Sequence, residues 1–153
     1  HVEALSANAG LRADLAAFDG PVVGECAGLL YLCTELDGHP MSGVLDIPGH
    51  FGPTLTLGYR DAVAVGDSAL FRTGERVTGH EFHRTTIAAR GISAPHPAWA
   101  WRGHDRAAGT HGVVDGSVHA SYLHVHPAGY PEAVARFVTS AAAAVGERGR
   151  RCS

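Results

Sequence analysis

The sequence predicts an α/β domain, and three observations carry that prediction. First, a stretch with helical spacing is followed by a short apolar strand, a glycine-containing corner and a second helical stretch, over residues 5–36. Second, the middle of the chain contains β-rich segments separated by turn residues. Third, an alanine-rich helical segment comes near the C-terminus, at residues 131–145.

Size and composition narrow the classes of protein to which this chain can belong. Its 153 residues fit one domain, which we place over 1–153, and 45% of them are hydrophobic. The net charge of −3, without a run of one sign, argues against a nucleic-acid or membrane partner, and we expect a cytoplasmic location. The chain contains no lysine, which excludes a phosphate-binding loop of the Gly-Lys-Ser/Thr type.

The expected elements follow from local patterns. Leu11, Leu15 and Phe18 have helical spacing within 5–18, Val22 and Val23 form a short strand, and 27–36 is helical until Asp37-Gly38. Later in the chain we expect strands in 54–65 and 77–89, and then a loop over 93–112 that Trp99 and Trp101 anchor. Two strands around Asp115-Gly116 and a helix over 131–145 should follow, with fraying beyond the helix.

The corner "GECAG" at residues 24–28 predicts a nucleophile. Small residues flank Cys26 in the manner of the strand-turn-helix elbow, in which neighbouring segments must approach closely. A thiol at a helix N-terminus has a lowered pKa, and the amides of Ala27 and Gly28 are candidates to hold an oxyanion. The alternative is a buried structural cysteine. Three cysteines without paired spacing support neither a disulfide framework nor a zinc site, and Cys33 is expected in the core.

A thiol nucleophile requires a base, for which histidine is the usual residue. Among eleven histidines, His124 and His126 stand at the end of an apolar strand and, by period-two spacing, on one face. The alternative is a pair of partly exposed loop histidines.

The segment "GHEFHR" contains a second polar group. His80 and His83 are three apart, which does not fit a helical zinc motif with histidines four apart. Glu81 and His83 share a strand face, as an accessory to the site or as a hydrogen-bonded structural pair.

Four motifs, "GECAGLLYL", "LGYR", "GHEFHRT" and "ASYLHVHPAG", resemble in order the C-terminal glutaminase domain of cobyrinic and hydrogenobyrinic acid a,c-diamide synthases. The resemblance implies a class I glutamine amidotransferase with a flavodoxin-like three-layer sandwich. It gives Cys26 as the nucleophile and His124 as the histidine that activates it. His126 occupies the place of the acid in related triads, and Glu25 is a further accessory candidate. Gly24 and Ala27 depart from the usual Ala and Gly but stay small.

The resemblance also implies partners. Glutamine is the expected substrate; ATP, Mg and the corrin precursor belong to an N-terminal synthetase domain, so no cofactor or metal is expected in this chain. A segment upstream of "HVEALSAN" supplies part of the oxyanion hole in the family, and the chain is therefore expected to be an N-terminally truncated, C-terminal fragment whose isolated activity is impaired. A homodimer is also among the expected partners.

Two alternatives stay open at this point. One is a hydrolase whose metal is held by His83, His124 and His126. The other is a domain that keeps the amidotransferase fold as an interaction surface without catalysis. Selective alkylation of Cys26 would separate the second alternative from the glutaminase.

Overall fold

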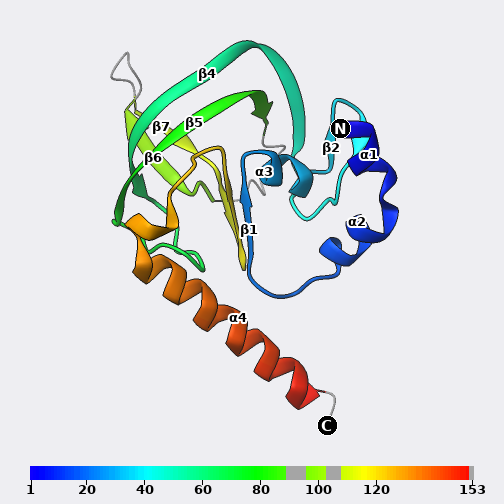
Figure 1. The fold of residues 1–153 in the computed structure, drawn as a ribbon, viewed down its shortest axis with the longest axis vertical. Helices are drawn as coiled ribbons and strands as arrows, with labels where there is room; N and C mark the ends of the chain where they lie inside the picture. The colour runs from blue at the N-terminus through cyan, green and yellow to red at the C-terminus, as the bar shows by residue number, and fades with distance from the viewer. Residues whose placement is uncertain (89–95, 103–107, 152–153) are drawn as a thin grey trace.

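A computed structural model of the chain describes residues 1–88, 96–102 and 108–151, although it leaves the side chains of 147–149 and 151 undescribed. The described part of the chain has helices near both ends and a long run of strands between them, and this mixture of helices and sheets confirms the predicted α/β class. Figure 1 shows two groups of strands with the N-terminal helices on one side and the last helix extending away from the body.

The N-terminal segment forms two helices. They are α1 (Val2–Ala7) and α2 (Ala9–Ala16), and Asn8 separates them. The Asn8 side chain accepts the backbone N–H of Leu11 at 3.1 Å, which caps α2. The predicted helical character is confirmed, but the single helix over 5–18 is wrong because Asn8 starts a new helix.

A three-stranded sheet holds the predicted corner. Strand β1 (Val22–Glu25) pairs in parallel with β9 (Val118–Ser121), and β9 pairs antiparallel with β8 (Val113–Asp115). Helix α3 (Ala27–Leu32) follows β1 directly. The strand at Val22 and the two strands around Asp115-Gly116 were therefore predicted correctly.

The predicted helix over 27–36 is too long. α3 ends at Leu32, and Cys33 is extended with φ −63° and ψ 169°. Residues Glu35–Leu36 form strand β2, which pairs antiparallel with β3 (His39–Pro40) and in parallel with the following long strand. Pairing with strands that come later in the chain therefore overrides the local helical pattern.

A long antiparallel ribbon dominates the second sheet. Its strands are β4 (Pro48–Ala64) and β5 (Arg76–Ile87), and the sheet order is β3-β2-β4-β6-β7, with β5 paired to β4. The ribbon arches over the molecule in Figure 1. It confirms the strands expected in 54–65 and 77–89.

The loop expected over 93–112 is wrong where the structure describes it. Strands β6 (Trp99–Arg102) and β7 (Ala108–His111) form a hairpin there, while 93–95 and 103–107 lie outside the described residues. Trp99 is fully buried and Trp101 is nearly so. The two tryptophans do anchor the segment as expected, but they do so from a strand.

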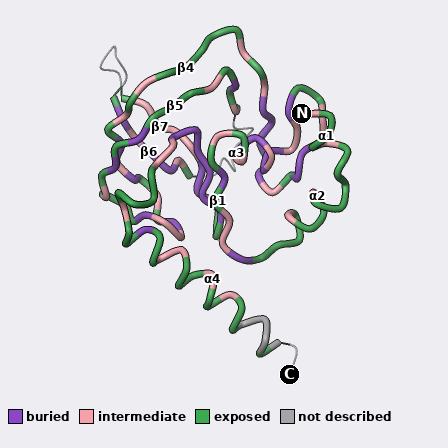
Figure 2. The backbone as a smooth tube through the Cα atoms, in the orientation of Figure 1, coloured by how far each residue is buried: buried purple, intermediate pink, exposed green. Residues whose placement is uncertain are grey.

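Two apolar clusters form the core. In Figure 2 the buried residues of the backbone are purple. One lies under α3 and includes Leu29, Leu45 and Ile47; the other surrounds Trp99 and includes Phe71 and Leu123. The rings of Phe71 and Trp99 meet edge to face with centroids 4.9 Å apart.

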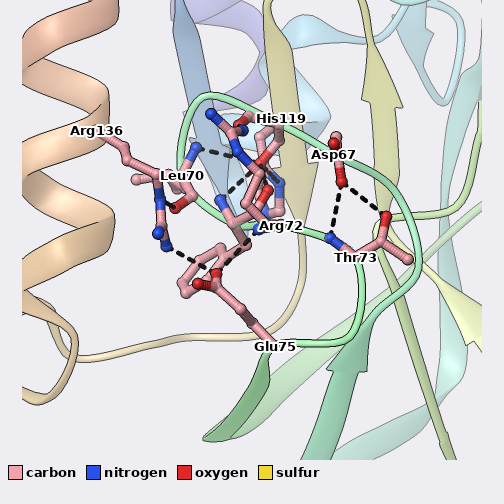
Figure 3. A network of polar contacts seen from close by, with 9 residues as sticks. Asp67, Leu70, Arg72, Thr73, Glu75, His119 and Arg136 are labelled. Carbon is pink, nitrogen blue, oxygen red and sulfur yellow. Dashed lines mark hydrogen bonds and ion pairs between the residues drawn. The ribbon is translucent and has the colours of Figure 1, made fainter.

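The last helix is held to the second cluster by a polar network. A short 3-10 turn, η1 (Pro127–Gly129), precedes α4 (Pro131–Arg151). Arg136 of α4 donates to the carbonyl of Leu70 at 2.8 Å and to the carboxylate of Glu75 at 2.7 Å (Figure 3). The predicted helix over 131–145 is confirmed and continues to Arg151, so the fraying expected after 145 is not seen up to that residue. Within the described residues, no helix combines the length and apolar character needed to cross a membrane.

Candidate active site

Cys26 lies at the junction of β1 and α3, as the sequence predicts. Its backbone has φ 52° and ψ −105°, a conformation that side-chain-bearing residues rarely adopt. Its N–H donates to the carbonyl of Ser121 at 2.9 Å, so the pairing of β1 with β9 continues up to the corner. Strain of this kind costs about 1–3 kcal/mol and is concentrated at functional sites.

The two glycines of the elbow have different roles. A Cβ on Gly24 would lie 2.7 Å from a terminal methyl of Leu32 and 3.1 Å from the carbonyl carbon of Gly28. A Cβ on Gly28 would meet no described atom within 4 Å. The steric reason for a small residue is thus confirmed at Gly24 and wrong at Gly28.

The Cys26 thiol is half-buried. Its Sγ lies 3.9 Å from the carbonyl oxygen of Phe82, at the limit for a hydrogen bond with sulfur. Burial raises the pKa of Cys26; the N–H of Ala27 lowers it, and the carboxylate of Glu25 raises it further. The predicted lowering of this pKa is wrong, because desolvation outweighs the single amide.

Cys33 is the structural cysteine that the sequence predicts. It is fully buried, its thiol lies 3.4 Å from the carbonyl oxygen of Leu29, and burial raises its pKa to about 11. Cys152 lies outside the described residues. Cys26 is therefore the more accessible and more readily ionised of the two described thiols.

His124 contacts Glu25, the residue before Cys26. Its Nδ1 lies 2.8 Å from Glu25 Oε1. Its ring stacks on the ring of His80 at 4.8 Å with an interplanar angle of 11°. The backbones of His80 and His124 exchange two hydrogen bonds, of 3.1 and 2.8 Å. His124 is thus held from the ring edge, the ring face and the backbone.

Strand β5 contacts both the predicted nucleophile and the predicted base. The carbonyl of Phe82 contacts Cys26, and His80, two residues earlier, pairs with His124. Among the described residues, the Cys26 thiol forms its one hydrogen bond with Phe82, and none with His124. Such bonds are often loose without substrate and tighten when it binds.

His126 has a different role from His124. Strand β9 ends at Ser121, so the strand that was expected to carry both histidines on one face does not reach them. His126 is exposed, and its Nδ1 accepts the N–H of Ala128 at 3.2 Å, which caps η1. In this position it stabilises a turn.

Glu81 and His83 lie close together, but they are not hydrogen-bonded to each other, and His83 Nε2 is buried without a hydrogen-bond partner among the described residues. Glu81 is 5% exposed; its carboxylate lies 2.9 Å from Arg60 Nε and 3.5 Å from His83 Nε2. The Nδ1 of His83 lies 2.8 Å from the carbonyl of Thr85, and its ring stacks on Tyr122 at 3.7 Å. These side chains are on the face of β5 opposite to His80 and Phe82.

This group lines a cavity of about 760 Å³. The residues around it include Arg60, Glu81, His83, Trp101 and His111. Burial lowers the pKa of His111 there. Neither Cys26 nor His124 lines the cavity, so the cavity is separate from the predicted nucleophile and base.

The metal alternative finds no support in the geometry. In residues 1–88, 96–102 and 108–151, no group of three His, Cys, Asp or Glu side chains is placed to hold a metal ion. His83, His124 and His126 each bind a different partner. The three histidines proposed as ligands therefore do not form one site.

A family model for the CobB/CobQ-like glutamine amidotransferase domain matches residues 1–131. The chain belongs to this family. The resemblance given by the four motifs is thereby confirmed, and the strand-to-helix corner at Cys26 lies inside the matched part of the amidotransferase domain.

The named relatives are a,c-diamide synthases. This amidotransferase domain is 56% identical over 141 residues to a hydrogenobyrinate a,c-diamide synthase of Mycobacterium bovis, matching 90% of this chain and 30% of the relative. It is 56% identical over 137 residues to the Streptomyces coelicolor synthase of the same name, matching 88% and 27%. A cobyrinate a,c-diamide synthase of Methanothermobacter thermautotrophicus is 35% identical over 142 residues, matching 90% and 31%. The chain thus spans about a third or less of these relatives.

A solved structure described as a glutamine amidotransferase shares the fold. The likeness has a TM-score of 0.51 with 24% identity, and it covers 74% of this chain and 57% of that one. The amidotransferase fold that the motifs implied is confirmed.

Sequence reasoning missed three features of the site. It did not find the stacking of His80 on His124, the ion pair of Arg60 with Glu81, or the bond of Glu25 to His124. Each depends on pairing between strands distant in sequence. The alternation along "GHEFHR" separates His80 from Glu81 but does not indicate what either one faces.

Proposed function

We propose that this chain is the glutaminase part of an ATP- and glutamine-dependent a,c-diamidation of hydrogenobyrinate or cobyrinate in cobalamin biosynthesis. The observation that carries the proposal is the strained corner at Cys26, with His124 beside the same strand, in a chain 56% identical to hydrogenobyrinate a,c-diamide synthases. The identity favours hydrogenobyrinate over cobyrinate, whose named synthase is 35% identical.

In the proposed reaction, Cys26 attacks the side-chain amide of glutamine. The thiol proton passes to Nε2 of His124, and the thiolate sulfur bonds to the amide carbon. The N–H of Ala27, which already acts on the thiol, donates to the oxyanion, and Gly28 leaves open space beside it. Because burial raises the pKa of Cys26, few thiolates exist at neutral pH, and this transfer to a base is required.

The second half of the reaction releases both products. The tetrahedral intermediate collapses, the C–N bond breaks, and His124 returns its proton to the leaving ammonia. A water molecule then attacks the γ-glutamyl thioester while His124 takes its proton, which yields glutamate and the free thiol. Atoms and charge balance without any cofactor.

ATP and Mg belong to another part of such a synthase in this proposal. The chain has no lysine, and its described residues hold no cluster of acidic side chains that would bind a metal. These residues do not fit a nucleotide–magnesium complex, so we assign no step of the ATP reaction to them. In this proposal the corrin acid also reacts in the ATP-using part. The proposed homodimer is tested by measuring the molar mass of the assembly by light scattering.

The test is release of ammonia from glutamine, measured with glutamate dehydrogenase. We expect turnover that disappears in Cys26→Ala and in His124→Ala, while Cys33→Ala retains it because that thiol is a core residue. With ATP, Mg and an ATP-using synthetase part, hydrogenobyrinate should gain two amide groups from glutamine. Normal glutamine turnover in Cys26→Ala would contradict the proposal. If the wild-type protein, together with a synthetase part, releases no ammonia from glutamine, the non-catalytic alternative is favoured.

A further inference from the structure

The carboxylate of Glu25 faces two hydrogen-bond donors. Its Oε1 lies 2.8 Å from His124 Nδ1, and its Oε2 accepts the backbone N–H of Val125 at 3.3 Å. The second bond fixes the orientation of the carboxylate relative to the backbone that carries His124. An ionised carboxylate only accepts hydrogen bonds, so the ring nitrogen opposite Oε1 must carry a proton.

With Glu25 as the acceptor, this contact favours the Nδ1–H tautomer of the neutral ring. With the proton on Nδ1, the lone pair of the neutral imidazole is on Nε2. Among the described residues, Nε2 of His124 has no hydrogen-bond partner. The stacked ring of His80, at 4.8 Å and 11°, restricts rotation of the imidazole out of this plane.

The other candidates for this task have different partners. His126 accepts the N–H of Ala128, and the carboxylate of Glu81 contacts Arg60 and His83 on the opposite face of β5. Glu25 reaches His124 because β1 lies in parallel beside β9, which brings the end of one strand close to the segment that follows the other. The residue that precedes the nucleophile therefore contacts the base.

We propose that Glu25 is the positioning residue of the site, holding His124 in the Nδ1–H tautomer so that Nε2 can accept the Cys26 proton. This deepens the glutaminase proposal and rests on it. Glu25 stays ionised throughout and does not take up the proton. When Nε2 takes up the proton, His124 becomes a positively charged imidazolium, and the negative charge of Glu25 stabilises it.

The same carboxylate has an opposite effect on the thiol. Its charge raises the pKa of Cys26. Replacing it by a neutral isostere should therefore make the thiol easier to ionise while making the base less effective. A general loss of structure would also lower turnover and speed labelling of Cys26, but it would expose Cys33 as well, so Cys33 that stays unlabelled separates a positioning role from a loss of structure.

The variant Glu25→Gln tests this role. An amide has one accepting oxygen and one NH₂ group, so it cannot accept from both His124 and Val125. With the oxygen on Val125, the NH₂ donates to Nδ1 and forces the Nε2–H tautomer. Glu25→Asp keeps the charge with a shorter reach, and Glu3→Gln, on exposed α1, is the matched control.

We expect four results. By nitrogen NMR of the imidazole, neutral His124 is the Nδ1–H tautomer in the wild-type chain and shifts toward Nε2–H in Glu25→Gln. The kcat for glutamine hydrolysis falls about 10²-fold in that variant, with KM changed by less than about threefold. This is smaller than the roughly 10⁴-fold loss for a buried triad carboxylate, because Glu25 is 47% exposed. Iodoacetamide labels Cys26 faster in Glu25→Gln, and Glu25→Asp recovers part of kcat.

The outcomes separate the two proposals. An unchanged His124 tautomer in Glu25→Gln overturns the positioning role, whatever happens to the rate. A wild-type kcat in Glu25→Gln also overturns it. Loss of turnover in Glu3→Gln equal to that in Glu25→Gln would assign the effect to stability and overturn it as well. If wild-type protein fails to hydrolyse glutamine both alone and together with an ATP-using synthetase part, the glutaminase proposal fails, while the tautomer measurement still decides whether Glu25 orients His124.

Discussion

The guanidinium of Arg60 and the carboxylate of Glu81 form an ion pair of 2.9 Å between β4 and β5, with side chains 13% and 6% exposed. Removal of one partner from a buried pair leaves the other charge without compensation, which costs about 3–5 kcal/mol. We expect Arg60→Met to lower the free energy of unfolding by about 3 kcal/mol, measured in urea. The double variant Arg60→Met, Glu81→Leu should recover most of the loss. A loss below about 0.5 kcal/mol in the single variant would show that water already screens the pair.

The close approach at Gly24 predicts a second effect on stability. Gly24→Val places methyl groups against Leu32 and the backbone of α3, so we expect a loss of about 1–3 kcal/mol. Gly28→Ala is the matched control, because its Cβ meets no described atom within 4 Å and alanine favours a helix by up to about 1 kcal/mol. Urea unfolding compares the two. Equal destabilisation by both variants would contradict this description of the elbow.

Burial of His119 predicts a dependence of stability on pH. Its Nδ1 lies 3.1 Å from the Ser68 hydroxyl, and burial lowers its pKa to about 4, from 6.5 for the free side chain. Between these values the unfolded chain binds a proton that the folded chain does not, so stability falls as the pH drops from 6.5 to 4. The contribution is about 3 kcal/mol.

Chemical denaturation at several pH values measures this effect. We expect His119→Gln to flatten the curve between pH 6.5 and 4, while His96→Gln, at an exposed position, leaves its slope as in the wild-type chain. A slope unchanged in His119→Gln would show that other groups cause the acid destabilisation.

The raised pKa of Cys26 predicts how its alkylation depends on pH. Because only the thiolate reacts, labelling by iodoacetamide should increase about tenfold per unit between pH 7 and 9 and continue to rise above the ordinary thiol value of 9.0. Mass spectrometry of the peptide containing Cys26 follows the reaction, and buried Cys33 should stay unlabelled until the chain unfolds. A plateau reached below pH 8 would mean that the thiol is activated even without substrate.

Local patterns predicted the parts of the fold that depend on nearby residues. The corner at Cys26, the strand at Val22 and the helix from Pro131 follow from glycine placement and apolar spacing. The patterns failed at β2 and at β6, where pairing across the sheet decides the conformation. They also failed for the pKa of Cys26, since burial depends on the surrounding fold.

The site was predictable to a similar degree. A cysteine elbow and a histidine near a strand end identify candidates for nucleophile and base, and the structure brings both beside β5. The partners of His124 were not predictable, because Glu25 is 99 residues away in sequence and meets it through the parallel pairing of β1 with β9. The helix N-terminus was expected to lower the pKa of the Cys26 thiol, but burial of the thiol raises this pKa by more.

Covalent capture by a glutamine-shaped electrophile, 6-diazo-5-oxo-L-norleucine, followed by peptide mapping, tests whether Cys26 is the nucleophile. We expect one adduct, on the sulfur of Cys26, which excess glutamine suppresses and which Cys26→Ala lacks. Labelling that falls on other residues, or that glutamine does not slow, would contradict the claim that this thiol attacks the side-chain amide of glutamine.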